Sequence, residues 1–168
     1  GGLVSYGACG LPYYVEGLFP DVGMLMETPV GVARNAEFFR KVKGFKTLTR
    51  TEAVEIDRQG KTVRVRHLDS GAEENLPYDK LVLATGSRPV QPPISGLELE
   101  NVWTMRQPGD AETLVKEIEA NGLRRAVLIG AGYIGVEMAE ALRRRGLEVT
   151  MVEMFDQIMP QFLDPEMA

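Results

Sequence analysis

The chain has 168 residues, of which 44% are apolar, enough for one good-sized domain or two small ones with a packed core. Its formal net charge of -5 argues against a nucleic-acid partner, because nucleic-acid-binding proteins usually carry a basic face. No apolar run reaches the roughly 18 residues of a membrane span and no charged-then-apolar leader opens the sequence, so we expect a cytoplasmic protein that does not contact a membrane.

The single cysteine, Cys9, lies in the stretch SYGACGLPYY. One cysteine cannot form a disulfide within its own chain, so it is buried apolar filler, a reactive thiol or half of an intermolecular bridge. Ser5 is a suitable N-cap for a short helix that would carry Cys9 in its early turns. There the helix dipole would favour the thiolate, which is the form that attacks disulfides and peroxides. Composition leaves the three alternatives open.

Two kinds of periodicity follow. Thr28 and Pro29 resemble an N-cap and a first helical residue, and apolar residues recur at helical spacing up to Gly44, which predicts a helix over residues 29–43. From Phe45 onward, apolar and polar residues alternate. This alternation predicts strands over residues 47–56, 62–68 and 74–76, joined by turns.

A compact apolar run, residues 81–84, ends at Thr85 and Gly86. Continuous apolar runs of this length are typical of a strand buried inside a parallel sheet. Residues 87–109 are rich in proline and indicate a connection between two domains, with Trp103 packing it against one of them. We therefore expect a domain boundary at about residue 107.

The last third of the chain predicts a β-α-β unit preceded by a helix. The expected elements are a helix over 110–121, a strand over 125–129, a helix over 133–145 and a strand over 148–153. Gly122 and Gly146 mark the ends of the two helices. The basic run 143–145 is interpreted as the solvated side of the second helix.

Three glycines in this unit, Gly130, Gly132 and Gly135, have the spacing G-x-G-x-x-G directly after a strand and before a helix. In such a turn the first glycine permits a sharp bend, the second lets the backbone approach a pyrophosphate, and the third lets the helix pack on the strand. Ile134 lies inside the turn, at the helix N-terminus that would face the phosphates. This context favours a dinucleotide site over a glycine turn without a ligand.

Glu153 ends the second strand of the unit, where a carboxylate accepts hydrogen bonds from the ribose hydroxyls of a bound dinucleotide. A carboxylate at this position also repels the 2′-phosphate of NADPH. Residues 154–157 contain no arginine or lysine that would bind that phosphate. The sequence thus favours NADH over NADPH.

Tyr133 and Glu137 lie at the glycine turn and one helical turn later. On spacing alone, Tyr133 is a packing aromatic and Glu137 a surface carboxylate, since Glu140 and Arg144 on the same helix have the spacing of an ordinary solvated pair. No metal-ligand spacing surrounds Cys9 or the single histidine, so we expect no metal.

Three stretches together, SYGACGLPYY, YDKLVLATGSRP and GAGYIGVEMAE, resemble the pyridine nucleotide-disulfide oxidoreductases. The resemblance is to the single-cysteine branch: coenzyme A disulfide reductases, NADH oxidases, NADH peroxidases and persulfide reductases. Tyr14 stands where glutathione-reductase relatives carry a second cysteine, and Pro12 where a thioredoxin-reductase pair would need one. The family implies an α/β, Rossmann-like three-layer FAD/NAD(P)-binding fold, here truncated, with an inserted β-hairpin or meander.

The resemblance also implies roles for individual residues. Cys9 would be the sulfur that faces FAD and cycles between thiolate and a mixed disulfide, a persulfide or a sulfenic acid. Thr85 and Gly86 would contact FAD. Tyr133 would cover the flavin until NADH displaces it, and Glu137 would lie near the flavin and the nicotinamide.

We therefore expect an internal fragment of an FAD-dependent NADH oxidoreductase that acts as a homodimer. Residues 1–107 would be a partial FAD domain without its glycine motif, and 108–168 the first half of the NAD domain. The expected substrate is a coenzyme A disulfide or persulfide, with oxygen or peroxide as the alternative; coenzyme A disulfide reductases commonly have asparagine where this chain has Ala8. A ferredoxin- or rubredoxin-type reductase would need no cysteine here, and the fragment alone would be a non-catalytic cofactor-binding module.

Overall fold

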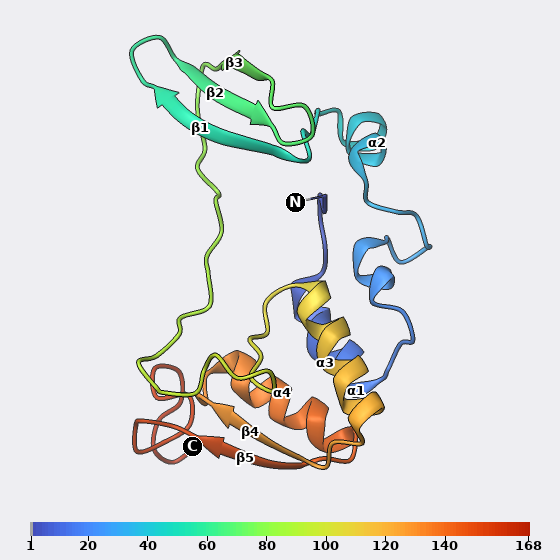
Figure 1. Cartoon of the computed structure of the whole chain (residues 1–168), viewed down its shortest axis with the longest axis vertical. Coiled ribbons are helices and arrows are strands. Elements are labelled where there is room, and N and C mark those ends of the chain that lie inside the picture. Colours follow the sequence, from blue (N-terminus) through green and yellow to red (C-terminus); the bar gives the residue numbers. More distant parts are fainter. Residues whose placement is uncertain (1) are drawn as a thin grey trace. The chain divides into compact units, whose positions relative to one another are not determined.

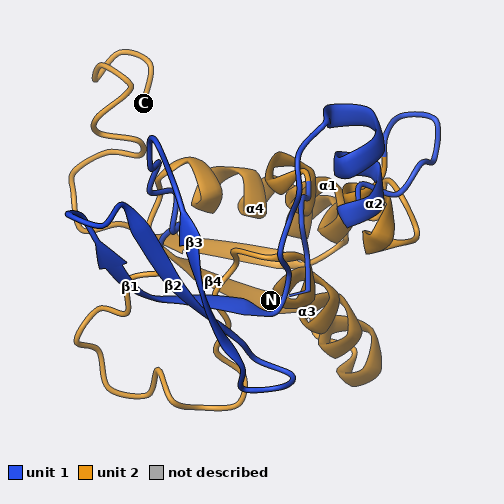
Figure 2. Ribbon diagram, turned by 90° about the horizontal axis from the view of Figure 1, so that it is seen from above, with its two compact units in different colours: residues 1–6, 28–88 blue, residues 7–27, 89–168 orange. Residues whose placement is uncertain are grey.

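The computed structural model describes residues 2–168, which form two compact units (Figures 1 and 2). The first unit contains the residues up to Tyr6 and Thr28–Arg88, and the second contains Gly7–Glu27 and Pro89–Ala168. Cys9 and the glycine turn at 130–135 thus belong to the same unit. The division of the chain into domains at residue 107 stays a prediction.

An antiparallel meander forms most of the first unit. It consists of β1 (Thr51–Asp57), β2 (Thr62–His67) and β3 (Glu73–Pro77), in that order across the sheet. The turn between the first two strands is held by the Asp57 carboxylate, which accepts hydrogen bonds from the backbone N–H groups of Gln59 and Gly60, both at 2.9 Å. The predicted inserted meander is confirmed, although β1 begins four residues later than expected.

The helix predicted over 29–43 is wrong in its first half. The structure has α2 (Ala36–Phe38), which continues into η3 (Phe39–Lys43), a π-helical turn. The Asn35 side chain caps α2 by accepting from the Phe38 N–H at 3.0 Å. Thr28 instead closes a local turn, in which its hydroxyl accepts from the Val32 N–H at 3.1 Å. Asparagine is the stronger cap, so the helix begins there.

The buried strand predicted over 81–84 is also wrong. These residues form no regular element and are exposed, with Val82 at 85% and Leu83 at 68% of their full exposure. A parallel strand is stabilised by ladder hydrogen bonds and burial that only neighbouring strands supply. Within the described part of the chain, the two sheets are β1–β3 and β4–β5, and neither includes this run.

The second unit contains the predicted β-α-β element. Strands β4 (Arg125–Ile129) and β5 (Glu148–Val152) pair in parallel, and α4 (Tyr133–Arg144) connects them and packs on both (Figure 1). The preceding helix α3 (Pro108–Asn121) begins two residues earlier than expected, because the Asp110 carboxylate accepts from the Gln107 N–H at 2.9 Å in a capping box. Gly122 ends it in the left-handed conformation.

Short helices from the start of the chain complete this unit. They are η1 (Ala8–Gly10), α1 (Leu11–Glu16) and η2 (Val22–Met26). Helix α1 packs on α4 and α3. The buried side chains of α1, α3 and α4 form the core: Leu11, Tyr14, Val15, Ala111, Val115, Ile118, Met138, Ala141 and Leu142. Burial raises the pKa of Tyr14, and the negative charge of Glu112 raises it further. Tyr14, at the place of the second cysteine in two-cysteine relatives, is therefore a packing residue.

The basic run 143–145 does more than solvate a helix face. Arg145 donates to the Val15 carbonyl oxygen at 2.6 Å and pairs with Glu119, and its side chain is only 17% exposed. Arg144 lies at 3.0 Å from Glu16 and 2.8 Å from Glu140. The two arginines thus fasten α1 and α3 to the end of α4, which corrects the interpretation of this run as a merely solvated face. None of the described helices is both long and apolar enough to cross a bilayer.

Candidate functional site

The glycine turn between β4 and α4 has the geometry that its sequence predicts. Gly130 has a φ of +99°, a conformation that L side chains rarely adopt. A Cβ on Gly135 would lie 2.1 Å from the Gly130 carbonyl oxygen, so only glycine lets α4 start this close to β4. A Cβ on Gly132 would meet no atom within 4 Å. The middle glycine therefore leaves bare backbone facing open space.

Helix α4 starts at this turn and presents its N-terminus there. Gly132 is the N-cap residue, and no side chain caps the helix. The N–H groups of the first turn, including those of Tyr133 and Ile134, have no partner within the helix. Free N–H groups and the positive end of the helix dipole favour an anionic group, and the open side of Gly132 leaves room for it. The turn thus fits a pyrophosphate.

Glu153 follows β5 directly and its carboxylate reaches the same turn. Oε2 accepts from the Ala131 N–H at 2.7 Å, while Oε1 accepts from the N–H groups of Met154 at 2.7 Å and Phe155 at 3.1 Å. These hydrogen bonds hold the pKa of Glu153 below its ordinary value, and the bond from Ala131 contributes most. The carboxylate is therefore anionic at neutral pH and lies beside the glycine turn.

Tyr133 opens α4, and its ring packs on Phe162, a residue that no motif of the sequence includes. The ring centroids of Tyr133 and Phe162 are 4.3 Å apart, at an angle of 41°. The Met159 N–H donates to the Ala131 carbonyl oxygen at 2.9 Å. The segment after β5 thus folds over the turn. It shows no regular periodicity, so no signal in the sequence identified Phe162 or Met159.

Cys9 lies in η1, directly before α1. Its turn is closed by a hydrogen bond from the Gly10 N–H to the Gly7 carbonyl oxygen at 2.9 Å, and Gly7 is the N-cap residue. The predicted cap, Ser5, lies outside the turn, so that prediction is wrong; glycine bends the chain at this point without a side-chain bond. The Cys9 thiol is exposed. Of the three alternatives, buried filler is excluded.

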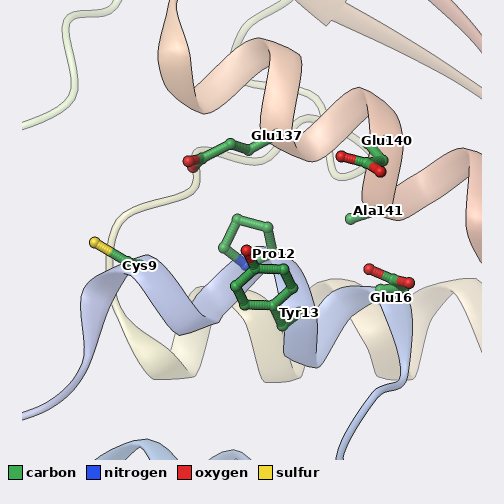
Figure 3. A pocket seen from close by; sticks show the side chains of 7 residues that line it. All are labelled: Cys9, Pro12, Tyr13, Glu16, Glu137, Glu140 and Ala141. Atoms are coloured by element: carbon green, nitrogen blue, oxygen red, sulfur yellow. The ribbon is translucent and has the colours of Figure 1, made fainter.

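A small pocket between α1 and α4 brings Cys9 and Glu137 together (Figure 3). Its lining residues are Cys9, Pro12, Tyr13, Glu16, Glu137, Glu140 and Ala141. Figure 3 shows Cys9 and the Glu137 carboxylate toward one end and Glu16 and Glu140 toward the other, where Arg144 pairs with both. The pocket volume is about 40 Å³, enough for one or two water molecules only. A larger substrate would approach the thiol from its exposed side.

Tyr133, Thr85 and Gly86, which the sequence also predicts as site residues, do not line this pocket. Tyr133 lies one turn before Glu137 on α4, and its ring packs on Phe162 instead. Thr85 and Gly86 belong to the first unit and are exposed; Gly86 has a φ of +75°. Their role toward FAD stays a prediction. Among residues 2–168, no cluster of three or more His, Cys, Asp or Glu side chains is arranged to bind a metal ion.

Comparison with known families shows which family the chain belongs to. The family model described as pyridine nucleotide-disulphide oxidoreductase matches residues 4–168. The chain belongs to this family of enzymes. Its α/β fold is the Rossmann-type fold of FAD- and NAD-binding oxidoreductases, as expected.

Relatives within the family are named for different reactions. An NADH oxidase of Methanocaldococcus jannaschii is 39% identical over 168 residues, which cover 98% of this chain and 35% of the relative. A CoA-dependent NAD(P)H sulfur oxidoreductase of Pyrococcus furiosus is 34% identical over 165 residues, with 98% and 35% covered. The chain thus spans about a third of the length of these relatives.

Solved structures show the same division. An NAD-dependent persulfide reductase from A. fulgidus superimposes with a TM-score of 0.90 and 48% identity, over 99% of this chain and 30% of the other. A water-forming NADH oxidase from Lactobacillus brevis, bound to NADH, superimposes with a TM-score of 0.80 and 31% identity, over 96% and 34%. One relative is named for a sulfur acceptor and the other for the formation of water.

Proposed function

We propose that this chain is the NADH-binding and thiol-bearing part of a flavoprotein reductase that reduces a coenzyme A disulfide or persulfide. The observation that carries the proposal is the pocket shared by Cys9 and Glu137, because Glu137 lies on the helix that starts at the glycine turn. The thiol and the turn therefore belong to one packed unit. The names of the persulfide reductase and of the CoA-dependent sulfur oxidoreductase support a sulfur substrate.

The glycine turn and Glu153 would bind NADH. Gly132 and the uncapped N-terminus of α4, including Ile134, fit the pyrophosphate, while Gly130 and Gly135 give the turn its shape. The anionic carboxylate of Glu153 favours a ribose with a free 2′-hydroxyl over one with a 2′-phosphate.

FAD, when bound, would accept a hydride from NADH and pass two electrons to the sulfur. In the second unit, Cys9 and Tyr133 are the residues that would face it. In the first unit, the family resemblance implies a contact of Thr85 and Gly86 with FAD, and the positive φ of Gly86 suits a close approach of bare backbone. Within the described residues, the turn at 130–135 is the one strand–glycine–helix turn, and in this proposal NADH would occupy it. FAD binding by the isolated chain is therefore a separate question, and the non-catalytic module remains the alternative for it.

The sulfur chemistry would run on Cys9. Its thiolate attacks one sulfur of a disulfide RS–SR′, forming a mixed disulfide with RS and releasing R′S⁻, which takes a proton. The two electrons of NADH then cleave the mixed disulfide to the Cys9 thiolate and RS⁻, which takes a second proton. The sum is NADH, one proton and the disulfide converted to NAD⁺ and two thiols. The exposed position of Cys9 supports this attack.

A second candidate, reduction of oxygen or peroxide, is favoured by the name of the 39% identical NADH oxidase. In that case the Cys9 thiolate would attack hydrogen peroxide, supplied as such or formed by two-electron reduction of oxygen; the O–O bond would break, the sulfur would become a sulfenic acid and the other oxygen would leave as hydroxide, which takes a proton to give water. Two electrons from NADH and two protons would return the sulfenic acid to the thiol with release of a second water. The two candidates use the same residues and differ in the acceptor.

The test is Cys9→Ser in the full-length protein that contains this chain. We expect disulfide and persulfide reduction to fall by at least about 100-fold, while electron transfer from NADH to an artificial quinone acceptor persists. Unchanged disulfide reduction would remove Cys9 from the mechanism. Comparing kcat/KM for coenzyme A disulfide, coenzyme A persulfide, oxygen and hydrogen peroxide separates the two candidates.

The isolated chain needs its own test. A flavin spectrum after purification would contradict the module alternative, and a colourless protein would limit catalysis to the full-length enzyme. Titration with NADH then tests the turn: Gly132→Ala should weaken binding, because the added methyl enters the open space beside the backbone. Gly109→Ala, on α3, also meets no atom within 4 Å and is the matched control.

A further inference from the structure

Ala131, the residue between the first two glycines of the turn, is held on both sides of its backbone. Its N–H donates to Glu153 Oε2 at 2.7 Å and its carbonyl oxygen accepts from the Met159 N–H at 2.9 Å. The preceding residue, Gly130, donates to the Val152 carbonyl oxygen at 2.8 Å. Ala131 is completely buried. The turn is thus fastened to the end of β5 and to the segment that follows it.

The bond from Ala131 to Glu153 is the part of this fastening that depends on a side chain. A buried N–H without an acceptor is costly, and a glycine-rich turn has much backbone freedom to lose. A carboxylate offers about four acceptor positions. Three are used by Ala131, Met154 and Phe155, so one is left for a ribose hydroxyl. A ribose can therefore bind to Glu153 while the turn stays held.

We infer that Glu153 is a positioning residue for the glycine turn as well as the proposed ribose acceptor, so that the shape of the turn and the choice of cofactor depend on one side chain. This inference deepens the proposed NADH site. The part that concerns the choice of cofactor rests on the proposed function, whereas the part that concerns the shape of the turn does not. It follows that removal of the carboxylate, which would relieve repulsion of a 2′-phosphate, also releases Ala131. A change at position 153 alone then loses NADH without gaining NADPH.

Low pH should act in the same direction. The hydrogen bonds to Glu153 lower its pKa in the folded protein, so their stabilising effect is present above the ordinary carboxyl pKa and is lost as the pH falls through the lowered value. Protonation replaces one acceptor by a donor beside backbone N–H groups. Because its pKa is lowered, Glu153 takes up a proton at a lower pH than carboxyl groups with an ordinary pKa, so the turn should loosen only after those groups have been protonated.

The experiment measures two quantities in Glu153→Gln: hydrogen exchange at the Ala131 amide without cofactor, and the Kd for NADH and NADPH. We expect exchange at Ala131 to accelerate by about 10-fold or more, since a hydrogen bond to a charged group is lost. We expect NADH binding to weaken by a similar factor and NADPH binding not to improve. Glu148→Gln, at the exposed opposite end of β5, is the control and should change neither.

A ribose acceptor without a role in the turn would give a different result. Exchange at Ala131 would stay unchanged in Glu153→Gln, and NADPH would bind more tightly; either outcome overturns the inference. If Glu153→Gln fails to fold, Glu153→Asp keeps the charge but shortens the reach, and should accelerate exchange at Ala131. If wild-type protein binds no NADH but exchange at Ala131 still depends on Glu153, the proposed function fails and the positioning role stands.

Discussion

The run at residues 81–84 and strand β4 have similar apolar character, and each leads to a turn that contains glycine. Their surroundings differ. Strand β4 pairs with β5, which follows α4, and Ala126 and Leu128 are partly buried. Val82 and Leu83 are exposed and pair with no strand of the described residues. An apolar run thus becomes a parallel strand only where the chain also supplies its neighbour.

The largest expected difference between the two regions lies in their glycines. Gly135→Ala places a methyl 2.1 Å from a backbone oxygen, which no side-chain rotation relieves, so α4 must move away from β4. We expect a loss of unfolding free energy of about 3 kcal/mol or more. Gly86→Ala introduces the strain of a φ of +75° and should cost about 1 kcal/mol. Urea unfolding of both variants checks this, and equal losses would contradict it.

The next largest difference between the two regions is expected in the free energy of unfolding that is lost when an apolar side chain is removed. Leu142 on α4 is 2% exposed and Leu83 is 68% exposed. Leu142→Ala leaves a cavity in the core and should cost about 2 to 3 kcal/mol. Leu83→Ala should change the free energy of unfolding by less than about 0.5 kcal/mol. A large loss on Leu83→Ala, measured by the same unfolding assay, would mean that the run at 81–84 is buried in solution.

The same difference explains how much of the fold the sequence could predict. The β4–α4–β5 unit was predictable because its glycine spacing, helix period and strand lengths agree within about 30 residues. The helix start at Ala36 was missed because two residues, Thr28 and Asn35, compete as caps, and only the local hydrogen bonds decide between them. The strand at 81–84 was predicted from composition, which carries no information on neighbours.

The candidate site was predictable in its parts and not in its assembly. Motif spacing identified the glycines and Glu153, and the family resemblance identified Cys9, Tyr133 and Glu137. That Cys9 and Glu137 line one pocket follows from the packing of α1 on α4, which no local pattern encodes. The bond from Ala131 to Glu153 likewise joins residues 22 positions apart.

A smaller effect is expected from charged residues. Arg145 is mostly covered and donates to the Val15 carbonyl oxygen, so Arg145→Met leaves that oxygen without its partner and should cost about 1 to 2 kcal/mol. Arg64, in the meander, pairs with Glu55 and Glu73 at the surface. Arg64→Met should have no measurable effect on stability in 1 M salt, where such pairs are screened. If both variants lose the same stability in 1 M salt, α1 is not fastened by Arg145.

The smallest effect concerns the aromatic pair beside the glycine turn. The Tyr133 ring rests on Phe162, and such pairs contribute about 0.5 to 1.5 kcal/mol beyond their buried area. If NADH must displace Tyr133 from this position, Phe162→Leu lowers the cost of displacement. We then expect NADH to bind about two- to fivefold more tightly, with a change in the NMR signals of the Tyr133 ring. Phe155→Leu, which alters an exposed ring in the same segment, is the control. Weaker binding by Phe162→Leu would mean that Tyr133 stays on Phe162 while NADH is bound, and that the stacked ring belongs to the liganded site.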